Sequence, residues 1–130
     1  MYSATVPPEY VEDENHRLAF YRKLAGAVNG AELRALRREI RDRFGPVPAE
    51  VDRLLRVTRL RILAHRRGLD SLETRGDVLL MRRAGAWVDP DGRPPRLHAA
   101  DPDARIDEIA GILVRLHLAA VKCRARSPSG

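Results

Sequence analysis

REIRDRFGPVPAEV, which spans residues 38–51, decides how the first half of the chain folds. A helical run of charged and apolar residues stops at Gly45, the residue type that most readily takes the left-handed conformation that closes a helix. Pro46 cannot continue that helix because it lacks a backbone N–H, and Pro48 suits the first turn of a new one. The stretch therefore predicts two helices joined by a short turn.

Helical periodicity extends on both sides of this turn. Upstream, Leu33, Leu36 and Ile40 recur at three- and four-residue steps and predict a helix over about 31–43. Downstream, a longer helix that ends at Gly68 carries two apolar stripes on almost opposite sides, so we expect it to be packed on two sides and to be the hub of the core. The stripes are Val51, Leu54, Leu55, Thr58 and Ile62 on one side, and Val57, Leu60 and Ala64 on the other.

A first helix is expected before these two, starting at Asp13 or Glu14 and ending at Asn29-Gly30. Its apolar positions recur at helical spacing and are expected to form the buried face. They are Leu18, Tyr21, Leu24, Ala25 and Val28.

After Gly68 the pattern changes from helical to extended. The runs LDSLET and VLLMRR flank Gly76-Asp77 and predict a β-hairpin with a tight turn. Asp89–Gly92 predicts a further turn, and we expect 87–88 and 96–98 to pair across it as short strands. A last helix opens with Asp101 as its N-cap and Pro102 at its first position. Its expected apolar face is Ile106, Ile109, Ala110, Leu113, Leu116, Ala120 and Val121.

These elements predict an α+β fold in which three N-terminal helices are packed with a small antiparallel sheet and a C-terminal helix. A chain of 130 residues fits one domain with a core of its own. We expect an extended lead-in at 1–8, a single domain at 9–123 and a disordered tail at 124–130, where the apolar pattern is lost.

Composition and motifs exclude several classes of function. One cysteine, Cys123, cannot form an internal disulfide, and the absence of a signal-peptide pattern favours a cytoplasmic protein. No phosphate-binding loop, nucleophile motif or metal-ligand spacing occurs, so we expect no enzyme activity, no metal and no cofactor. His98 with Asp101 and Asp103 comes closest to a metal cluster, but the two aspartates already serve the start of the last helix.

The charges of the helix at 31–43 divide between its two flanks. Glu32, Glu39 and Asp42 fall along one flank, whereas Arg34, Arg38 and Arg41 fall along the other. The plain interpretation is a solvated helix with internal pairs such as Glu39 with Arg43 and Arg38 with Asp42, each contributing about 0.3–0.5 kcal/mol. That interpretation does not explain the division of the charges.

Two stretches carry a resemblance to a known family. They are PPEYVEDENHRLAFYRKLAGA at 7–27 and EIRDRFGPVP at 39–48, and the similarity extends over about 7–82. In this order and spacing, the sequence resembles the C-terminal (TRCF) domain of bacterial transcription-repair coupling factors. The resemblance departs from the family pattern at 84–100, which is short and rich in proline.

The resemblance implies a regulatory role within a larger protein. Members of this family are ATP-dependent DNA translocases that displace stalled RNA polymerase and recruit the excision-repair protein UvrA. Their C-terminal domain docks on the UvrB-like N-terminal module of the same protein and masks its UvrA-binding surface. The positions that match the docking acids are Glu39 and Asp42, and Glu32 lies on the same flank.

Two alternatives stay open at this point. The net charge of +6 also suits a free-standing DNA-binding module that uses the arginines of the third helix, which are Arg53, Arg56, Arg59, Arg66 and Arg67. The last helix could join copies of the chain, although we expect a monomer. The sequence leaves open whether the chain is an excised domain or a protein by itself.

Overall fold

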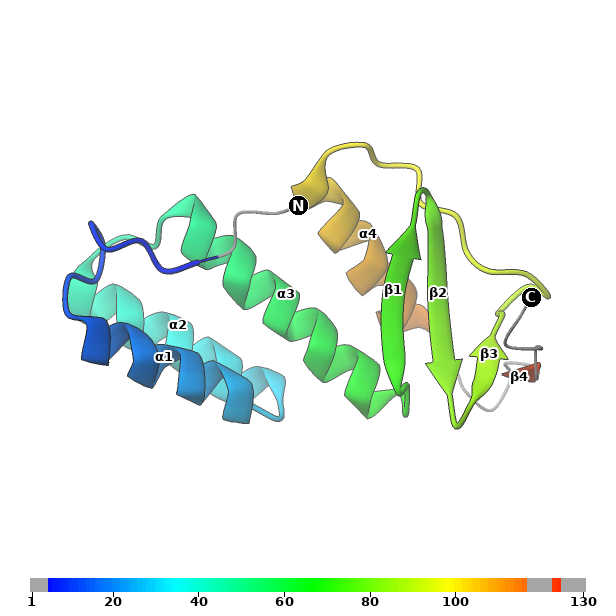
Figure 1. Ribbon diagram of the computed structural model, residues 1–130, viewed down its shortest axis with the longest axis horizontal. Helices are drawn as coiled ribbons and strands as arrows, with labels where there is room; N and C mark the ends of the chain where they lie inside the picture. The colour runs from blue at the N-terminus through cyan, green and yellow to red at the C-terminus, as the bar shows by residue number, and fades with distance from the viewer. Residues whose placement is uncertain (1–4, 117–122, 125–130) are drawn as a thin grey trace. The chain divides into compact units, whose positions relative to one another are not determined.

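The computed structural model describes residues 5–116 and 123–124. The elements follow in the order α1 (Glu14–Gly26), α2 (Gly30–Phe44), α3 (Ala49–Arg66), β1 (Ser71–Arg75), β2 (Val78–Arg83), β3 (Ala86–Val88), α4 (Pro102–Arg115) and β4 (Cys123–Arg124) (Figure 1). The predicted α+β class is confirmed. The chain divides into two compact units, Met1–Ile62 and Leu63–Gly130, which are described separately.

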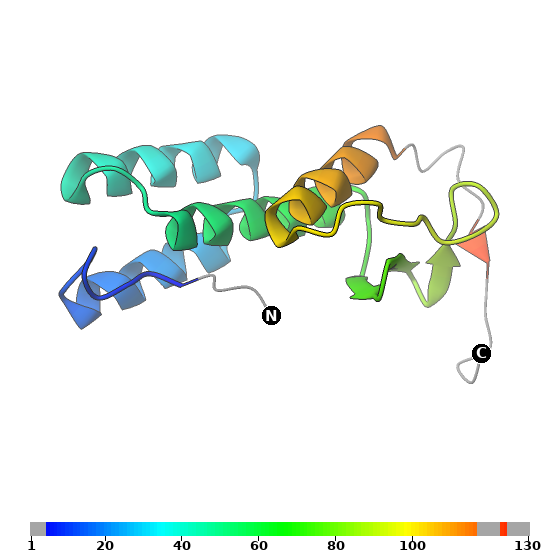
Figure 2. The same cartoon turned by 90° about the horizontal axis from the view of Figure 1, so that it is seen from above.

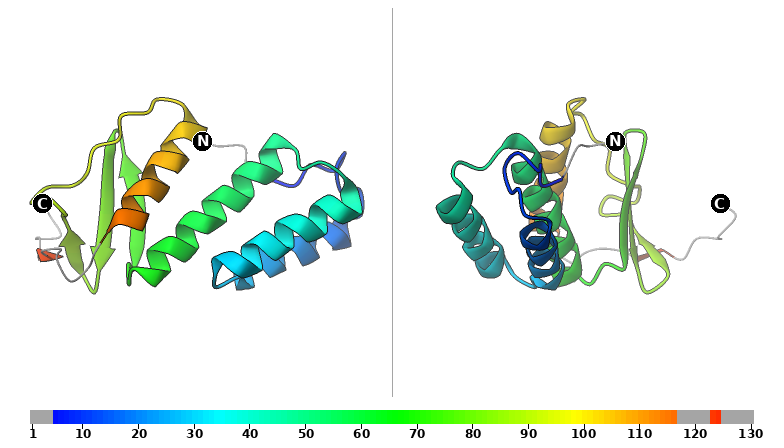
Figure 3. Two further views of the ribbon diagram at one scale, coloured as in Figure 1. Left: turned by 180° about the vertical axis from the view of Figure 1, so that it is seen from behind. Right: turned by 60° about the vertical axis from the view of Figure 1, so that its left-hand side comes forward.

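The first unit is a helical bundle in which α1 and α2 run side by side (Figure 3). Asp13 caps α1 by accepting a hydrogen bond from the N–H of Asn15, and Asn29 caps α2 by accepting one from the N–H of Glu32. The apolar side chains of all three helices form one core with the start of the chain. Its most buried members are Val11, Ala27, Ile40, Val51 and Leu55.

The start of α1 agrees with the sequence prediction, but its buried face agrees only in part and its end does not. Leu18 is 45% exposed and Val28 60% exposed. Leu24 is buried and Tyr21 packs against the core, as predicted. Phe20 and Ala27 are buried in addition, because the helix is turned so that their side meets the core. The helix ends at Gly26, and Asn29 belongs to the cap of the next helix.

The turn between α2 and α3 is fixed by Gly45, whose φ is +96°. Its N–H donates to the carbonyl of Arg41 at 2.9 Å, which closes α2 as predicted. The hydroxyl of Tyr10 donates to the carbonyl of Gly45 at 2.7 Å, so the segment before α1 is tied to this turn. Burial raises the pKa of Tyr10 above its ordinary 10.0.

Gly45→Ala is expected to lower the free energy of unfolding by about 1–3 kcal/mol, because an alanine at this positive φ is strained. A Cβ would meet nothing within 4 Å there, so the cost is conformational. Gly26→Ala is the matched control: its Cβ also meets nothing within 4 Å, and in a helix alanine should stabilise by about 0.4–1 kcal/mol. Urea denaturation measures both, and equal effects would contradict the conformational explanation.

The second unit contains a sheet in which the strands are ordered β1-β2-β3-β4 and all neighbours are antiparallel. β1 and β2 form the predicted hairpin, with Leu72 opposite Met81 and with Gly76 at a φ of +61° in the turn. The predicted turn at Asp89–Gly92 is also present, since the N–H of Gly92 donates to the carbonyl of Asp89 at 3.1 Å.

The predicted pairing of 87–88 with 96–98 is wrong. β3 pairs with β2 and with β4, whereas Arg96 forms an isolated bridge to Val78. A tight turn at Ala84-Gly85, where both residues have positive φ, returns the chain directly along the free edge of β2. Pro94 and Pro95 have no N–H to donate, which limits any ladder on the following segment.

Helix α4 lies over one face of the sheet (Figures 1 and 2). Asp101 caps it and Pro102 occupies its first turn, as predicted. It buries Ile106, Ile109, Ala110 and Leu113, which is the predicted face as far as the structure describes it. Ala120, Val121 and the tail at 125–130 lie outside the described residues.

The carboxylate of Glu108 holds the segment that leads into α4. The N–H groups of Ala99 and His98 donate to it at 2.8–3.0 Å, and these bonds lower its pKa below the ordinary 4.5. A carboxyl group whose pKa is depressed by folding stabilises the fold above its unfolded pKa, and this contribution is lost as the pH falls through the folded pKa.

Glu108→Gln is therefore expected to reduce stability at pH 7 and to make stability less dependent on pH below the ordinary pKa of 4.5. Thermal melts between neutral and acid pH measure the effect. Glu9→Gln, which removes an exposed carboxylate from the start of the chain, controls for the lost charge. A constant difference between wild type and Glu108→Gln across the whole pH range would contradict the linkage.

Candidate docking surface on the second helix

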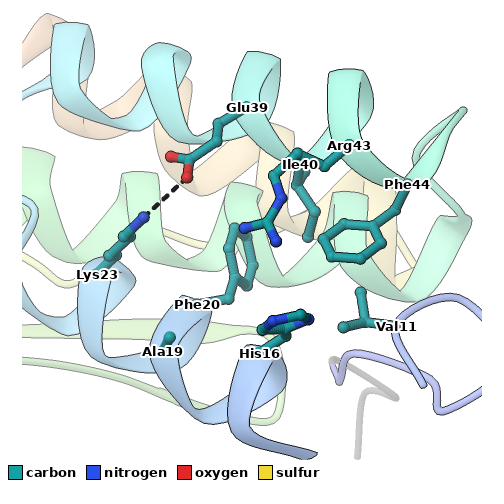
Figure 4. A pocket seen from close by; sticks show the side chains of 9 residues that line it. All are labelled: Val11, His16, Ala19, Phe20, Lys23, Glu39, Ile40, Arg43 and Phe44. Carbon is teal, nitrogen blue, oxygen red and sulfur yellow. Dashed lines mark hydrogen bonds and ion pairs between the residues drawn. The ribbon is translucent and has the colours of Figure 1, made fainter. Parts of the chain in front are cut away.

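Glu39 projects from α2 toward α1. Its Oε1 lies 2.8 Å from Nζ of Lys23, and the two side chains are 44% and 51% exposed (Figure 4). The internal partner considered from the sequence was Arg43, but the observed partner belongs to the neighbouring helix. Because both groups face solvent, the pair contributes little to stability, about 0.2–1 kcal/mol.

Asp42 is the more open of the two candidate acids. Its side chain is 66% exposed, and the nearest cation, Nε of Arg41, is 3.9 Å from its Oδ1. At this distance, the attraction between two exposed groups is weak. Asp42 and Glu39 are three residues apart in one helix and therefore lie on the same side of it.

Glu32 lies at the start of α2, away from Glu39 and Asp42 along the helix, and has a structural role. Its Oε2 accepts a hydrogen bond from the N–H of Val28 at 2.9 Å, while its own N–H donates to Oδ1 of Asn29 at 2.8 Å. This reciprocal arrangement closes the N-terminus of α2 in the manner of a capping box. The spacing of Asn29 and Glu32 carries that signal in the sequence.

A small pocket lies beside Glu39 between α1 and α2, with a volume of about 40 Å³. Figure 4 shows Phe20, Ile40 and Phe44 lining it from the two helices. Lys23, Glu39 and Arg43 also border it, and the Arg43 guanidinium lies 5.1 Å from the centre of the Phe44 ring. The candidate surface therefore combines an exposed carboxylate with a hollow that can take the tip of one apolar side chain.

The five arginines considered for DNA binding are divided between the two units. Arg53, Arg56 and Arg59 belong to the first unit and Arg66 and Arg67 to the second. Arg67 donates from Nε to the carbonyl of Leu113 and from Nη2 to that of Val114, both at 2.9 Å, so it serves the C-terminal end of α4. These residues do not all share one role.

Residues 5–116 and 123–124 carry neither a cluster of metal ligands nor a membrane-spanning helix. In this part of the chain, no group of three potential ligands is placed to hold a metal ion. The helices described are also too short or too polar to cross a membrane.

The match to a family model now identifies the class of domain. The model of the TRCF domain matches residues 1–86, so this chain belongs to the TRCF domain family. The resemblance seen in the sequence is thereby confirmed.

Individual relatives are transcription-repair-coupling factors. The chain is 45% identical over 60 residues to the factor of Haemophilus influenzae, which is 46% of this chain and 5% of the relative. It is 34% identical over 101 residues to that of Mycobacterium tuberculosis, covering 78% of this chain and 8% of the relative. The chain thus spans less than a tenth of the length of these relatives.

A solved structure has the same fold. The crystal structure of the C-terminal domain of a transcription-repair coupling factor superposes with a TM-score of 0.72, covering 88% of this chain and 84% of that one. The sequences are 17% identical, so this similarity supports the fold alone.

Proposed function

We propose that this chain is the non-catalytic regulatory domain of a transcription-repair coupling factor, a cytoplasmic ATP-dependent DNA translocase that displaces stalled RNA polymerase and recruits UvrA. The domain docks on the UvrB-like N-terminal module of the same protein and masks its UvrA-binding surface. Glu39 and Asp42 form the docking contact, and the parent protein supplies the ATPase.

The observation that carries this proposal is the pair of exposed carboxylates on one side of α2. Neither is buried, and their nearest cations are Lys23 and Arg41 of the same unit. Arginines of a docking partner can replace such solvent-exposed contacts at little cost, whereas a buried pair would resist separation. Membership in the TRCF domain family supports the assignment of the partner.

The strength expected of this contact suits a reversible switch. A single exposed ion pair contributes about 0.2–1 kcal/mol, so two pairs with some apolar packing supply about 1–3 kcal/mol. The pocket beside Glu39 provides a place for that packing. A partner that competes for the masked surface can release a contact of this size.

The test is Glu39→Ala with Asp42→Ala in the full-length parent protein. Removing both carboxylates should open the UvrA-binding surface, so we expect UvrA affinity to rise about fivefold or more and the basal ATPase rate to increase. Glu9→Ala with Glu73→Ala removes the same charge from exposed positions elsewhere and should leave both quantities unchanged. An unaltered UvrA affinity in the Glu39/Asp42 variant would rule out autoinhibition through these acids.

A further inference from the structure

A second groove, lined by arginines, lies between α2 and α3 within the first unit. It has a volume of about 130 Å³, and its walls and floor are formed by Leu33, Arg34, Arg37, Leu55, Arg56 and Arg59. Both leucines are buried and belong to the two helices that face each other across the groove. At 100° per residue, these positions of α2 lie on a different side from Glu39 and Asp42.

One end of the groove already binds a carboxylate. Nη2 of Arg37 lies 2.7 Å from Oδ1 of Asp52, and Nη1 of Arg56 lies 3.8 Å from Oδ2 of the same side chain. Each oxygen of Asp52 therefore faces an arginine from a different helix. The structure itself shows that guanidinium groups of α2 and α3 can bind one carboxylate between them.

A second pair of arginines borders the groove one turn further from the α2–α3 connection. The two helices run in opposite directions (Figure 1), so a step of three residues back along α2 matches a step of three forward along α3. These steps lead from Arg37 to Arg34 and from Arg56 to Arg59. Within residues 5–116 and 123–124, neither Arg34 nor Arg59 is paired with a carboxylate.

We propose that Arg34 and Arg59 bind a carboxylate from an acidic segment of a protein partner. The partner's Asp or Glu takes the place at this pair that Asp52 takes at Arg37 and Arg56, and an adjoining apolar side chain covers the leucines of the floor. Four arginines border the groove, so it attracts anionic ligands. This proposal rests on the groove alone and is independent of docking through Glu39 and Asp42.

The groove favours a carboxylate over a nucleic-acid backbone. A planar guanidinium group can match a carboxylate with two parallel N–H···O bonds. Arg37 already donates one such bond to Asp52 at 2.7 Å. A space of about 130 Å³ with an apolar floor takes one side chain. A DNA duplex is too wide and too stiff to enter it, and would touch only the arginines at the rim.

The probe is a short fluorescein-labelled peptide of Glu and Asp residues around a central Leu, titrated with the full chain. Arg34→Gln with Arg59→Gln should weaken binding at least about tenfold, because two charge-assisted hydrogen-bonding groups are lost. Arg22→Gln with Arg83→Gln is the matched control, since it removes the same charge from exposed positions of α1 and β2 outside the groove. We expect it to change affinity less than about twofold.

Asp52→Asn provides a test that a loss of folding cannot imitate. It should release Arg37 from its ion pair at 2.7 Å and tighten binding of the peptide severalfold. An unchanged or weaker affinity would overturn the equivalence of the two arginine pairs. Circular dichroism checks that each variant is folded. If the two double variants lose equal affinity, binding depends on net charge and not on the groove, and the proposal is overturned. Tighter binding to a short DNA duplex than to the peptide would overturn it as well.

Discussion

Leu55→Ala is expected to lower the free energy of unfolding by about 2–5 kcal/mol, the largest effect of any change considered for this chain. Leu55 is only 1% exposed and lies in the core that α1, α2 and α3 share. Truncation removes buried methyl groups and leaves a cavity that the surrounding helices fill only in part. A loss of this size is a large fraction of the total stability of a domain.

Val57→Ala is the control in the same helix. Val57 is 36% exposed, and alanine has the higher helix propensity, so the change should stay within about 0.5 kcal/mol. Urea denaturation followed by circular dichroism gives both values. Equal losses at the two positions would mean that α3 does not bury the side containing Leu55 as described.

Glu39→Arg with Asp42→Arg is expected to weaken docking on the rest of the parent protein by about tenfold or more. Charge reversal removes two attractive contacts and sets two cations against the basic surface of the proposed partner, which costs more than removal of the acids alone. Lys23, which pairs with Glu39 at 2.8 Å, adds to the repulsion once that carboxylate is replaced. Isothermal titration of this chain against the parent lacking this domain measures the change.

Glu9→Arg with Glu73→Arg carries the same change in net charge at exposed positions on other segments. We expect its affinity to stay within about twofold of wild type, because neither glutamate belongs to α2 or lines the pocket beside Glu39. If this control weakens docking as much as the Glu39/Asp42 reversal, the contact depends on net charge and not on α2.

Local signals in the sequence predicted most of the element boundaries. Gly45 and Pro46 close α2, Gly76-Asp77 makes the hairpin turn, and Asp101 caps α4, because each of these depends on the conformation of a few neighbouring residues. The partner of β3 depends on which sheet edge is free, and no short pattern encodes that choice. Burial of Phe20 instead of Leu18 likewise depends on how α1 rests on the other helices.

Only those features of the candidate site that depend on one helix could be predicted from the sequence. Helical periodicity places Glu39 and Asp42 on one flank with Glu32, and the resemblance to the TRCF domain selects these two as docking acids. Both are exposed in the structure. The contact between Lys23 and Glu39 and the pocket next to it require α1 and α2 to be placed together, so spacing within either helix could not reveal them. The capping role of Glu32 was available in the sequence, from its distance to Asn29.

Competition between this chain and UvrA tests the central claim most directly. The parent protein produced without this domain is saturated with labelled UvrA, and the separate chain is then added. If the domain masks the UvrA-binding surface, the added chain displaces UvrA in proportion to the amount of chain bound. The Glu39→Arg/Asp42→Arg variant then displaces much less UvrA. A stable complex that holds UvrA and this chain together on the same parent molecule would contradict the account.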